Sequence, residues 1–332
     1  MKQVCRCGPQ GPWKKLPSRP LKIRIIRTGK ISKDIGMANL PKLTADQVRS
    51  IIPAATDVEK LASGGQKLVF RGTLYHKAYA LKFALLPAEV ESEDAQFTDV
   101  ATRAAREVEI MRSCSCPYMV KLGPIGLTFV TFEEQNLLYF SEEFITGSSL
   151  KTVLATDGPL PASEIVRLGV QIASAIQELW QFGKIHRDIK PANIMRSREN
   201  GDYVLLDAGL AFDVAGDSLS AGFLVGTPPY FSPEQFDYSN RRILDFRSDM
   251  FSLGVTLYET GTGQHPFWSR RETSQNVYTK ITTFTPQPPS SLAPGIPEAL
   301  DRVIMRMLGK FPHLRYRRCE QLISALEEVR IN

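Results

Sequence analysis

The stretch of sequence that decides the fold is the octapeptide HRDIKPAN at positions 186–193. It brings a carboxylate, an ammonium group and a carboxamide into one short loop, on Asp188, Lys190 and Asn193. These groups can respectively orient and deprotonate a hydroxyl, neutralise a transferring phosphoryl group and hold a metal ion. Asp207 follows four apolar residues and can supply a second metal-binding carboxylate. The pattern therefore indicates phosphoryl-transfer chemistry.

Four further motifs follow the order and spacing of a known family. They are YALK at 79–82, GTPPYFSPE at 226–234, DMFSLG at 249–254 and PHLR at 312–315. With the octapeptide, they make the chain resemble a eukaryotic-like (Hanks-type) serine/threonine protein kinase over about residues 54–329. The resemblance implies an α+β, two-lobed protein kinase-like fold. A small β-rich N-lobe would cover about 54–145 and a larger helical C-lobe about 146–332.

One acidic residue of the helix expected over 101–113 should pair with Lys82, which matches the family's phosphate-binding lysine. Glu107 shares a helical face with apolar residues three positions before it and four after it. It also stands ten residues before the proline that follows the helix, as the family's spacing requires. Glu109 is the competing candidate. The resemblance thus assigns catalytic roles to Asp188, Lys190, Lys82 and Glu107.

The family's glycine-rich loop is only partly matched. The segment LASGGQKLV at 61–69 keeps Gly64, where the backbone must approach the phosphates closely. Ala62 stands at the first glycine position and Lys67 at the third. Lys67 either adds positive charge near the nucleotide or is a solvated hairpin side chain, and the sequence leaves both interpretations open.

By resemblance, ATP would lie in the cleft between the lobes with Mg²⁺ or Mn²⁺ held by Asn193 and Asp207. Backbone groups of the predicted hinge between the lobes would bind the adenine, and apolar side chains would sandwich it. The residues assigned to the nucleotide are Ala62, Gly64, Val69, Ala80, Lys82, Glu143, Ile145 and Met195.

Two positions depart from the family pattern. Ala208 replaces a phenylalanine that usually packs on the helix carrying Glu107 and on His186, so we expect a gap that a neighbour refills. Glu142 stands at the gatekeeper position behind the adenine, where a partly desolvated carboxylate would need a partner. If the register differs by one residue, Ser141 occupies that position instead.

Residues of the C-lobe motifs are expected to hold the catalytic loop. By resemblance, Asp249 braces this loop and Arg315 is the buried partner of Glu234. Thr227 would contact Lys190 and the catalytic aspartate, a combination typical of serine/threonine rather than tyrosine kinases. The expected acceptor is therefore an aliphatic hydroxyl of a protein substrate.

The activation segment at 212–234 offers candidate regulatory residues. In the family, the arginine matching Arg187 commonly clamps a phosphate on this segment, and Ser218 and Ser220 are the candidate acceptors. We expect autophosphorylation, and constitutive activity with an unmodified loop is the alternative. Glu259 either attracts a basic substrate side chain or is a structural residue of its helix.

Composition bounds the class of protein. With 332 residues and 43% hydrophobic content, the chain can bury a two-lobed core. It has no run of 18 or more apolar residues, and no apolar signal core at its start, so we expect neither a transmembrane helix nor secretion. An odd count of five cysteines favours reduced thiols, hence a cytoplasmic location, and their spacing disfavours zinc.

The basic charge is concentrated at the N-terminus. Residues 1–33 hold ten of the 41 lysines and arginines and no acid, which leaves 31 basic residues against 35 acidic ones. We predict a basic, partly disordered arm over 1–42 with a short strand at 21–27. It would dock on an anionic partner (nucleic acid, acidic lipid or acidic protein) or be a solvated tail. A capping box predicts a helix over 43–53 that packs on the N-lobe, before a kinase domain over 54–332.

Three alternative functions compete with that of a protein kinase. A pseudokinase would bind nucleotide and regulate a partner without chemistry, but it would not need the complete set of catalytic residues. Small-molecule kinases of the same fold usually lack the features found at 226–234 and 312–315. A nucleic-acid-binding module with a kinase-like body is supported by the basic arm alone.

Overall fold

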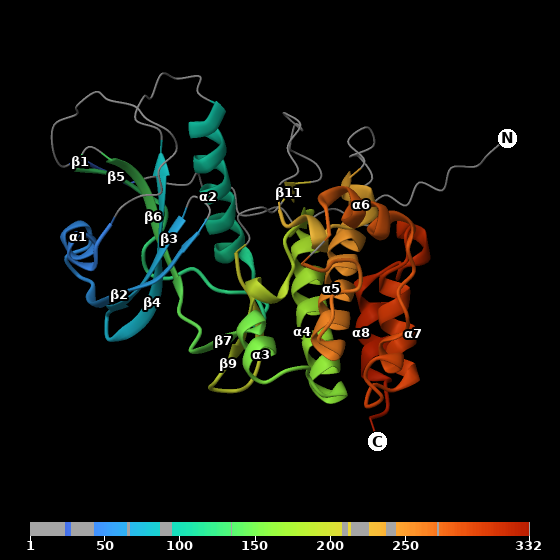
Figure 1. The fold of residues 1–332 in the computed structure, drawn as a ribbon. Helices are drawn as coiled ribbons and strands as arrows, with labels where there is room; N and C mark the ends of the chain where they lie inside the picture. The colour runs from blue at the N-terminus through green and yellow to red at the C-terminus, as the bar shows by residue number, and fades with distance from the viewer. Residues whose placement is uncertain are drawn as a thin grey trace. The chain divides into compact units, whose positions relative to one another are not determined.

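The structure is a computed structural model that describes residues 24–27, 43–64, 67–86, 95–133, 135–207, 212–213, 226–236, 244–270 and 272–331. The chain divides into two units, which are described separately (Figure 1). The small unit contains the described residues up to 148 together with 195–207, and the helical unit contains 149–194 and the described residues from 212 onward. Most of the basic arm, Ala208, Ser218 and Ser220 lie outside the described residues.

The small unit is built on a six-stranded sheet of order β1-β5-β6-β4-β3-β2 (Figure 1). Neighbours among β2 to β6 are antiparallel, whereas β1 pairs in parallel with β5. β1 confirms the strand predicted at 21–27 over residues 24–27, and residues 21–23 lie outside the described part of the chain. The strands are β1 (Arg24–Arg27), β2 (Thr56–Gly64), β3 (Lys67–Leu74), β4 (Lys77–Leu86), β5 (Thr128–Phe132) and β6 (Gln135–Glu143).

Successive side chains of β6 point to opposite faces of the sheet and so belong to two different cores of the small unit. Leu137 and Tyr139 belong to a core that also contains Val48 and Ile51 of α1 (Ala45–Ile51). The predicted capping box of α1 is present, and the helix packs on the sheet as expected. Leu138 and Phe140 belong to a second core, formed with α2 (Ala95–Ser113). The sheet is therefore covered by apolar packing on both faces.

A second sheet, of three strands, includes residues of the 195–207 segment, which belongs to the small unit. It has the order β10-β9-β7, formed by β7 (Gly147–Ser149), β9 (Ile194–Ser197) and β10 (Tyr203–Leu205). The amide of Leu205 donates to the Tyr118 carbonyl at 2.8 Å, and the amide of Val120 donates to the Leu205 carbonyl at 3.1 Å. These bonds place Asp207, two residues after β10, in the small unit.

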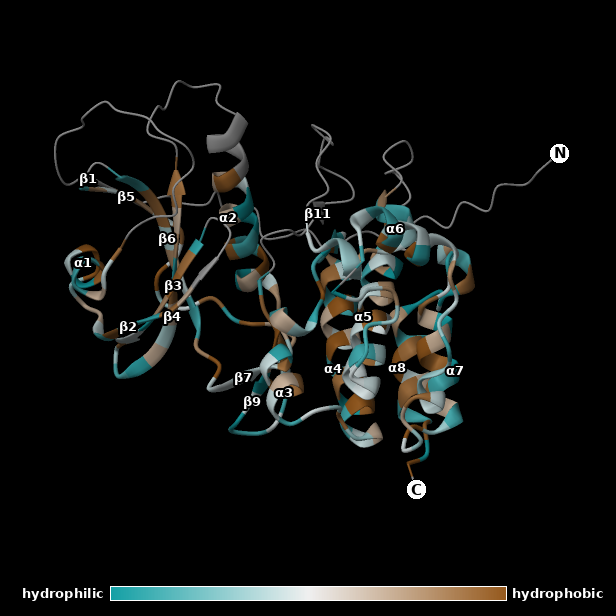
Figure 2. Cartoon of the chain, in the orientation of Figure 1, coloured by the Kyte–Doolittle hydropathy of each residue, from teal (hydrophilic) through white to brown (hydrophobic). Residues whose placement is uncertain are grey.

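The helical unit is organised around α5 (Phe246–Thr262), which is buried over nearly its whole length. It packs against α4 (Ala162–Gln181), which also contacts α8 (Cys319–Glu327), and apolar residues gather along these helices (Figure 2). A Cβ at Gly169 would lie 2.9 Å from Leu326 and 3.2 Å from Leu257, so this glycine permits the close packing. The other α-helices among the described residues of this unit are α3 (Leu150–Thr156), α6 (Ser274–Thr283) and α7 (Glu298–Met307).

The architecture is the expected α+β arrangement of a β-rich unit and a helical unit. The division falls after residue 148, close to the expected 145, but 195–207 joins the small unit although it follows the octapeptide at 186–193. β1, which lies within the predicted arm, belongs to the small unit's sheet. Among the described helices, none has both the length and the apolar composition needed to cross a bilayer.

Candidate active site

In the helical unit, three side chains converge on the carboxylate of Asp188. Lys190 Nζ donates to Oδ2 at 2.7 Å and Asn193 Nδ2 donates to the same oxygen at 2.8 Å. The hydroxyl of Thr227 donates to Oδ1 at 2.9 Å, and Lys190 Nζ also lies 2.5 Å from this hydroxyl. The contacts expected of Thr227 are thus confirmed. Donors on both oxygens fix the orientation of the carboxylate.

Asp249 holds the backbone that presents this carboxylate. It lies in the first turn of α5, and its Oδ2 and Oδ1 accept hydrogen bonds from the amides of His186 at 2.6 Å and Arg187 at 2.8 Å. Burial raises the pKa of Asp249, against the opposing effects of His186 and the two amides. Arg187 has a φ of 71°, a strained conformation that these bonds help to maintain. The predicted bracing role of Asp249 is confirmed.

Gly226 positions Thr227 beside the loop. Its φ of 126° is rarely adopted by residues with a Cβ. A Cβ at this position would lie 2.6 Å from the Phe231 ring and 3.1 Å from the Arg187 carbonyl oxygen. Only glycine therefore fits before the threonine that bonds to Asp188.

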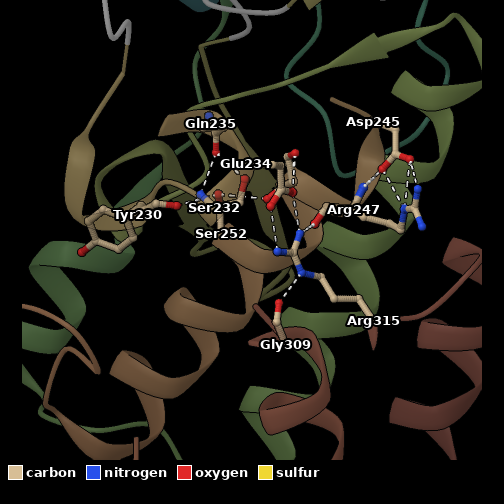
Figure 3. Close-up of polar contacts among 10 residues, drawn as sticks. Tyr230, Ser232, Glu234, Gln235, Asp245, Arg247, Ser252, Gly309 and Arg315 are labelled. Atoms are coloured by element: carbon tan, nitrogen blue, oxygen red, sulfur yellow. Dashed lines mark hydrogen bonds and ion pairs between the residues drawn. The ribbon is translucent and has the colours of Figure 1, made fainter. Parts of the chain in front are cut away.

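A buried ion pair anchors the segment that follows. Arg315 donates from its two terminal nitrogens to the two carboxylate oxygens of Glu234, at 2.6 and 2.9 Å (Figure 3). Two further N–H groups of Arg315 donate to the carbonyl oxygens of Gly309 and Arg247, each at 2.8 Å. Burial acts to raise the pKa of Glu234, but Arg315 outweighs it and the net pKa is lowered. The predicted pairing of Glu234 with Arg315 is confirmed.

Glu259 has an internal partner. Its Oε2 accepts a hydrogen bond from the Tyr230 hydroxyl at 2.6 Å, and burial raises its pKa despite this bond. Of the two interpretations left open by the sequence, this contact supports a structural role. It does not test whether a basic substrate side chain also approaches.

In the small unit, Lys82 and Glu107 form the ion pair that the sequence predicted. Lys82 Nζ on β4 donates to Glu107 Oε1 on α2 at 2.8 Å. The Lys82 side chain is 7% exposed and that of Glu107 is fully buried. Glu109, the competing candidate, is half-buried elsewhere on the same helix. The pair links the helix to the sheet.

Glu142 is a second carboxylate beside Lys82. Its Oε2 lies 2.9 Å from Lys82 Nζ, an ion pair without the alignment of a hydrogen bond. The strand register pairs Glu142 with Ala80 and thus puts it on the Lys82 face, whereas Ser141 faces the other side and bonds to the backbone of Ile125. The register with Glu142 beside the lysine is the observed one. Burial, opposed by Lys82, raises the pKa of Glu142 to about 7.

Lys67 is the residue whose place the sequence left undecided. Its Nζ donates to Glu107 Oε2 at 2.7 Å and to Asp207 Oδ1 at 3.1 Å. Its side chain is 26% exposed, so it is not a solvated hairpin residue. The sequence held one indication of this position. Lys67 stands two residues before Val69, so both side chains point to the same face of the sheet, and the strand register pairs Val69 with Lys82.

The other nucleotide-binding candidates of the small unit lie on the expected elements. Ala62 on β2 is opposite Val69 on β3, and Ala80 is buried on β4. The amide of Glu143 donates to the Lys121 carbonyl at 2.8 Å. Further positions are Gly64 at the end of β2, Ile145 packed on the α2-side core, and Met195 on β9. Their contacts with ATP stay predictions.

Asp207 of the small unit and Asn193 of the helical unit each carry an oxygen donor, the type of ligand that a hard cation such as Mg²⁺ prefers. Asp207 has a half-exposed carboxylate and a strained φ of 58°. Asn193 uses its amide hydrogens on the backbone and side-chain oxygens of Asp188, which leaves the amide oxygen for another group. No cluster of three or more His, Cys, Asp or Glu that could hold a metal occurs in the described part of the chain.

Comparison with known proteins agrees with this geometry. The sequence model of the protein kinase domain matches residues 55–325. Serine/threonine-protein kinase pkn3 of Myxococcus xanthus is 37% identical over 206 residues, which cover 59% of this chain and 37% of that protein. Serine/threonine-protein kinase PknH of Mycobacterium bovis is 32% identical over 271 residues, covering 81% of this chain and 43% of the relative. The chain thus spans well under half the length of these relatives.

We expect Arg315→Met to lower the free energy of unfolding by about 3–5 kcal/mol, because it leaves the buried Glu234 carboxylate without its cation. Urea denaturation measures the change. Arg302→Met is the matched control, since Arg302 is 73% exposed and its ion pair spans 4.0 Å. Arg315→Met combined with Glu234→Met should recover much of the loss. A double variant no more stable than the single one would contradict this account of the pair.

We expect Glu142 to make stability fall as pH rises. Its folded pKa of about 7 lies above the ordinary value of 4.5, so the folded protein holds an extra proton between these values. Relative to Glu142→Gln, the wild type should therefore lose at most about 3 kcal/mol between pH 4.5 and 7. Denaturation across pH 5–8 tests this, with exposed Glu59→Gln as control. A difference that stays constant over this range would contradict the prediction.

Proposed function

The chain belongs to the protein kinase family, and on this premise we propose that it is an ATP-dependent serine/threonine kinase. It would transfer the γ-phosphoryl group of Mg-ATP to a serine or threonine hydroxyl of a protein substrate, and to its own chain in autophosphorylation. The carrying observation is the Asp188 carboxylate held by Lys190, Asn193 and Thr227. The two relatives compared above are named for the same activity.

In the helical unit, Asp188 would accept the proton of the substrate hydroxyl as that oxygen attacks phosphorus. Lys190 would place its ammonium charge beside the transferring group, because its bonds to Asp188 and Thr227 fix the end of its side chain. These contacts orient the reacting groups before the reaction, so that little reorganisation remains for the transition state. Asn193 would offer its amide oxygen to a metal ion.

In the small unit, Lys82 would bind ATP phosphates, and Glu107 would hold its ammonium group in place. Asp207 would be the principal ligand of Mg²⁺, which neutralises phosphate charge when bound. The backbone at Gly64 would approach the phosphates, and hinge groups at Glu143 and Ile145 would bind the adenine. Ala62, Val69, Ala80 and Met195 would line the base.

A pseudokinase is the alternative function. No observation favours it, since Lys82, Glu107, Asp188, Asn193 and Asp207 are all present and the described contacts among them are formed. Binding of nucleotide without phosphotransfer would be its signature.

Other expectations stay predictions. They are the cytoplasmic location, an anionic partner for the basic arm at 1–33, and Ser218 or Ser220 as regulatory phosphorylation sites. The side chains on which the last two depend lie outside the described residues.

We expect Asp188→Asn to lower the phosphotransfer rate at least about 10²-fold while ATP binding is kept, because the change removes proton acceptance but not phosphate contacts. Labelled ATP with Mg²⁺, a cell lysate as substrate and mass spectrometry of the modified residues measure the rate and the acceptor type. Asp157→Asn, an exposed aspartate of the same unit, is the control. Equal rates in Asp188→Asn and wild type would overturn the assignment, and wild-type binding without transfer would support the pseudokinase.

A further inference from the structure

Two lysines, not one, are held by the buried carboxylate of Glu107. Lys82 donates to Oε1 at 2.8 Å and Lys67 donates to Oε2 at 2.7 Å. They come from different strands, since Lys67 begins β3 and Lys82 lies within β4. Lys67 also reaches Asp207 at 3.1 Å, which Lys82 does not do through any described hydrogen bond. Lys67 is therefore a cation in direct contact with the proposed metal ligand.

The surroundings of the two ammonium groups differ in a way that matters for a ligand. Lys82 is 7% exposed and lies between two carboxylates, those of Glu107 and Glu142. Lys67 is 26% exposed, and Asp207 beside it is 39% exposed. A ligand coming from solvent therefore meets the Lys67 and Asp207 side of the cluster more readily. An ammonium group has three donors, and Lys67 uses two of them here.

The charge of the cluster also favours a phosphate contact by Lys67. The cluster contains two ammonium groups and three carboxylates, those of Glu107, Glu142 and Asp207. A triphosphate brings several further negative charges, and Lys82 already shares its charge between two carboxylates. Without Lys67, the described cluster would present one cation to this ligand, and repulsion by its ionised carboxylates would oppose binding.

We propose that Lys67 is a second phosphate-contacting lysine, which binds the polyphosphate of the nucleotide from the Asp207 side while Lys82 binds it from the Glu142 side. This inference rests on the proposed function, because it concerns the same nucleotide. The position that in the family usually holds a glycine here carries a side chain that contributes to ligand binding. Removal of either lysine should therefore weaken the site without abolishing it.

Binding measurements on the full chain test the proposal. We expect Lys67→Met to weaken ATP about tenfold or more, as loss of a hydrogen bond to a charged group would, both with Mg²⁺ and with EDTA. Adenosine, which has no phosphate, should bind as it does to wild type. Lys67→Arg should restore most of the ATP affinity, and exposed Lys60→Met on β2 of the same hairpin should change neither ligand.

The Lys67→Met change made in a Lys82→Met protein distinguishes direct contact of Lys67 with the phosphates from an indirect role in positioning Glu107. If Lys67 acted only by holding Glu107 for Lys82, adding Lys67→Met to Lys82→Met would cost no further ATP affinity, and this result would overturn the proposal. Direct contact predicts a further loss of about tenfold, and residual phosphotransfer in Lys82→Met that the double variant lacks. Equal weakening of ATP and adenosine in Lys67→Met and Lys67→Gln would also overturn it. Wild type that binds neither ligand would instead refute the proposed function.

Discussion

The small unit depends on how it holds one fully buried carboxylate, that of Glu107. A buried charge is tolerated only when it is paired and hydrogen-bonded, and here each oxygen has its own ammonium donor. Because the donors lie on β3 and β4 and the carboxylate on α2, this single group fixes the helix to two strands. The apolar contacts of Val108 and Met111 supply packing over the same face, but they do not specify a unique register. The shared carboxylate does.

The helical unit uses buried charge in the same way. Asp249 directs its two oxygens at two consecutive amides, so a side chain on α5 sets the backbone conformation of the catalytic loop. Arg315 spreads its donors over Glu234 and two carbonyl groups, and thereby joins segments far apart in the sequence. Apolar burial along α4 and α5 stabilises the body of the unit. The charged groups determine where its loops lie.

Sequence reasoning succeeded where a local signal or a motif's spacing defined the contact. The capping box at Thr44 follows from the residues themselves, whereas the Lys82–Glu107 and Arg315–Glu234 pairs were predicted from the resemblance to the kinase family. It could not assign 195–207 to the small unit, because this depends on β10 pairing with residues some 85 positions earlier. The position of residues 195–207 in the sequence does not predict this pairing. The activation segment and Ala208 lie outside the described residues, so those predictions stay open.

The two departures near Lys82 are best understood together. The family arrangement of one lysine between a helix glutamate and a metal-binding aspartate has one cation and two carboxylates. Glu142 adds a carboxylate and Lys67 adds an ammonium group, so with every group ionised the net charge of the cluster is unchanged. Each addition alone would change the charge balance, since an extra buried acid competes with Glu107 for Lys82, and an extra cation competes with Lys82 for Glu107. Because the pKa of Glu142 is raised to about 7, this balance also varies with pH near neutrality. Lys67 and Glu142 are therefore coupled through Lys82 and Glu107, although they lie on different strands.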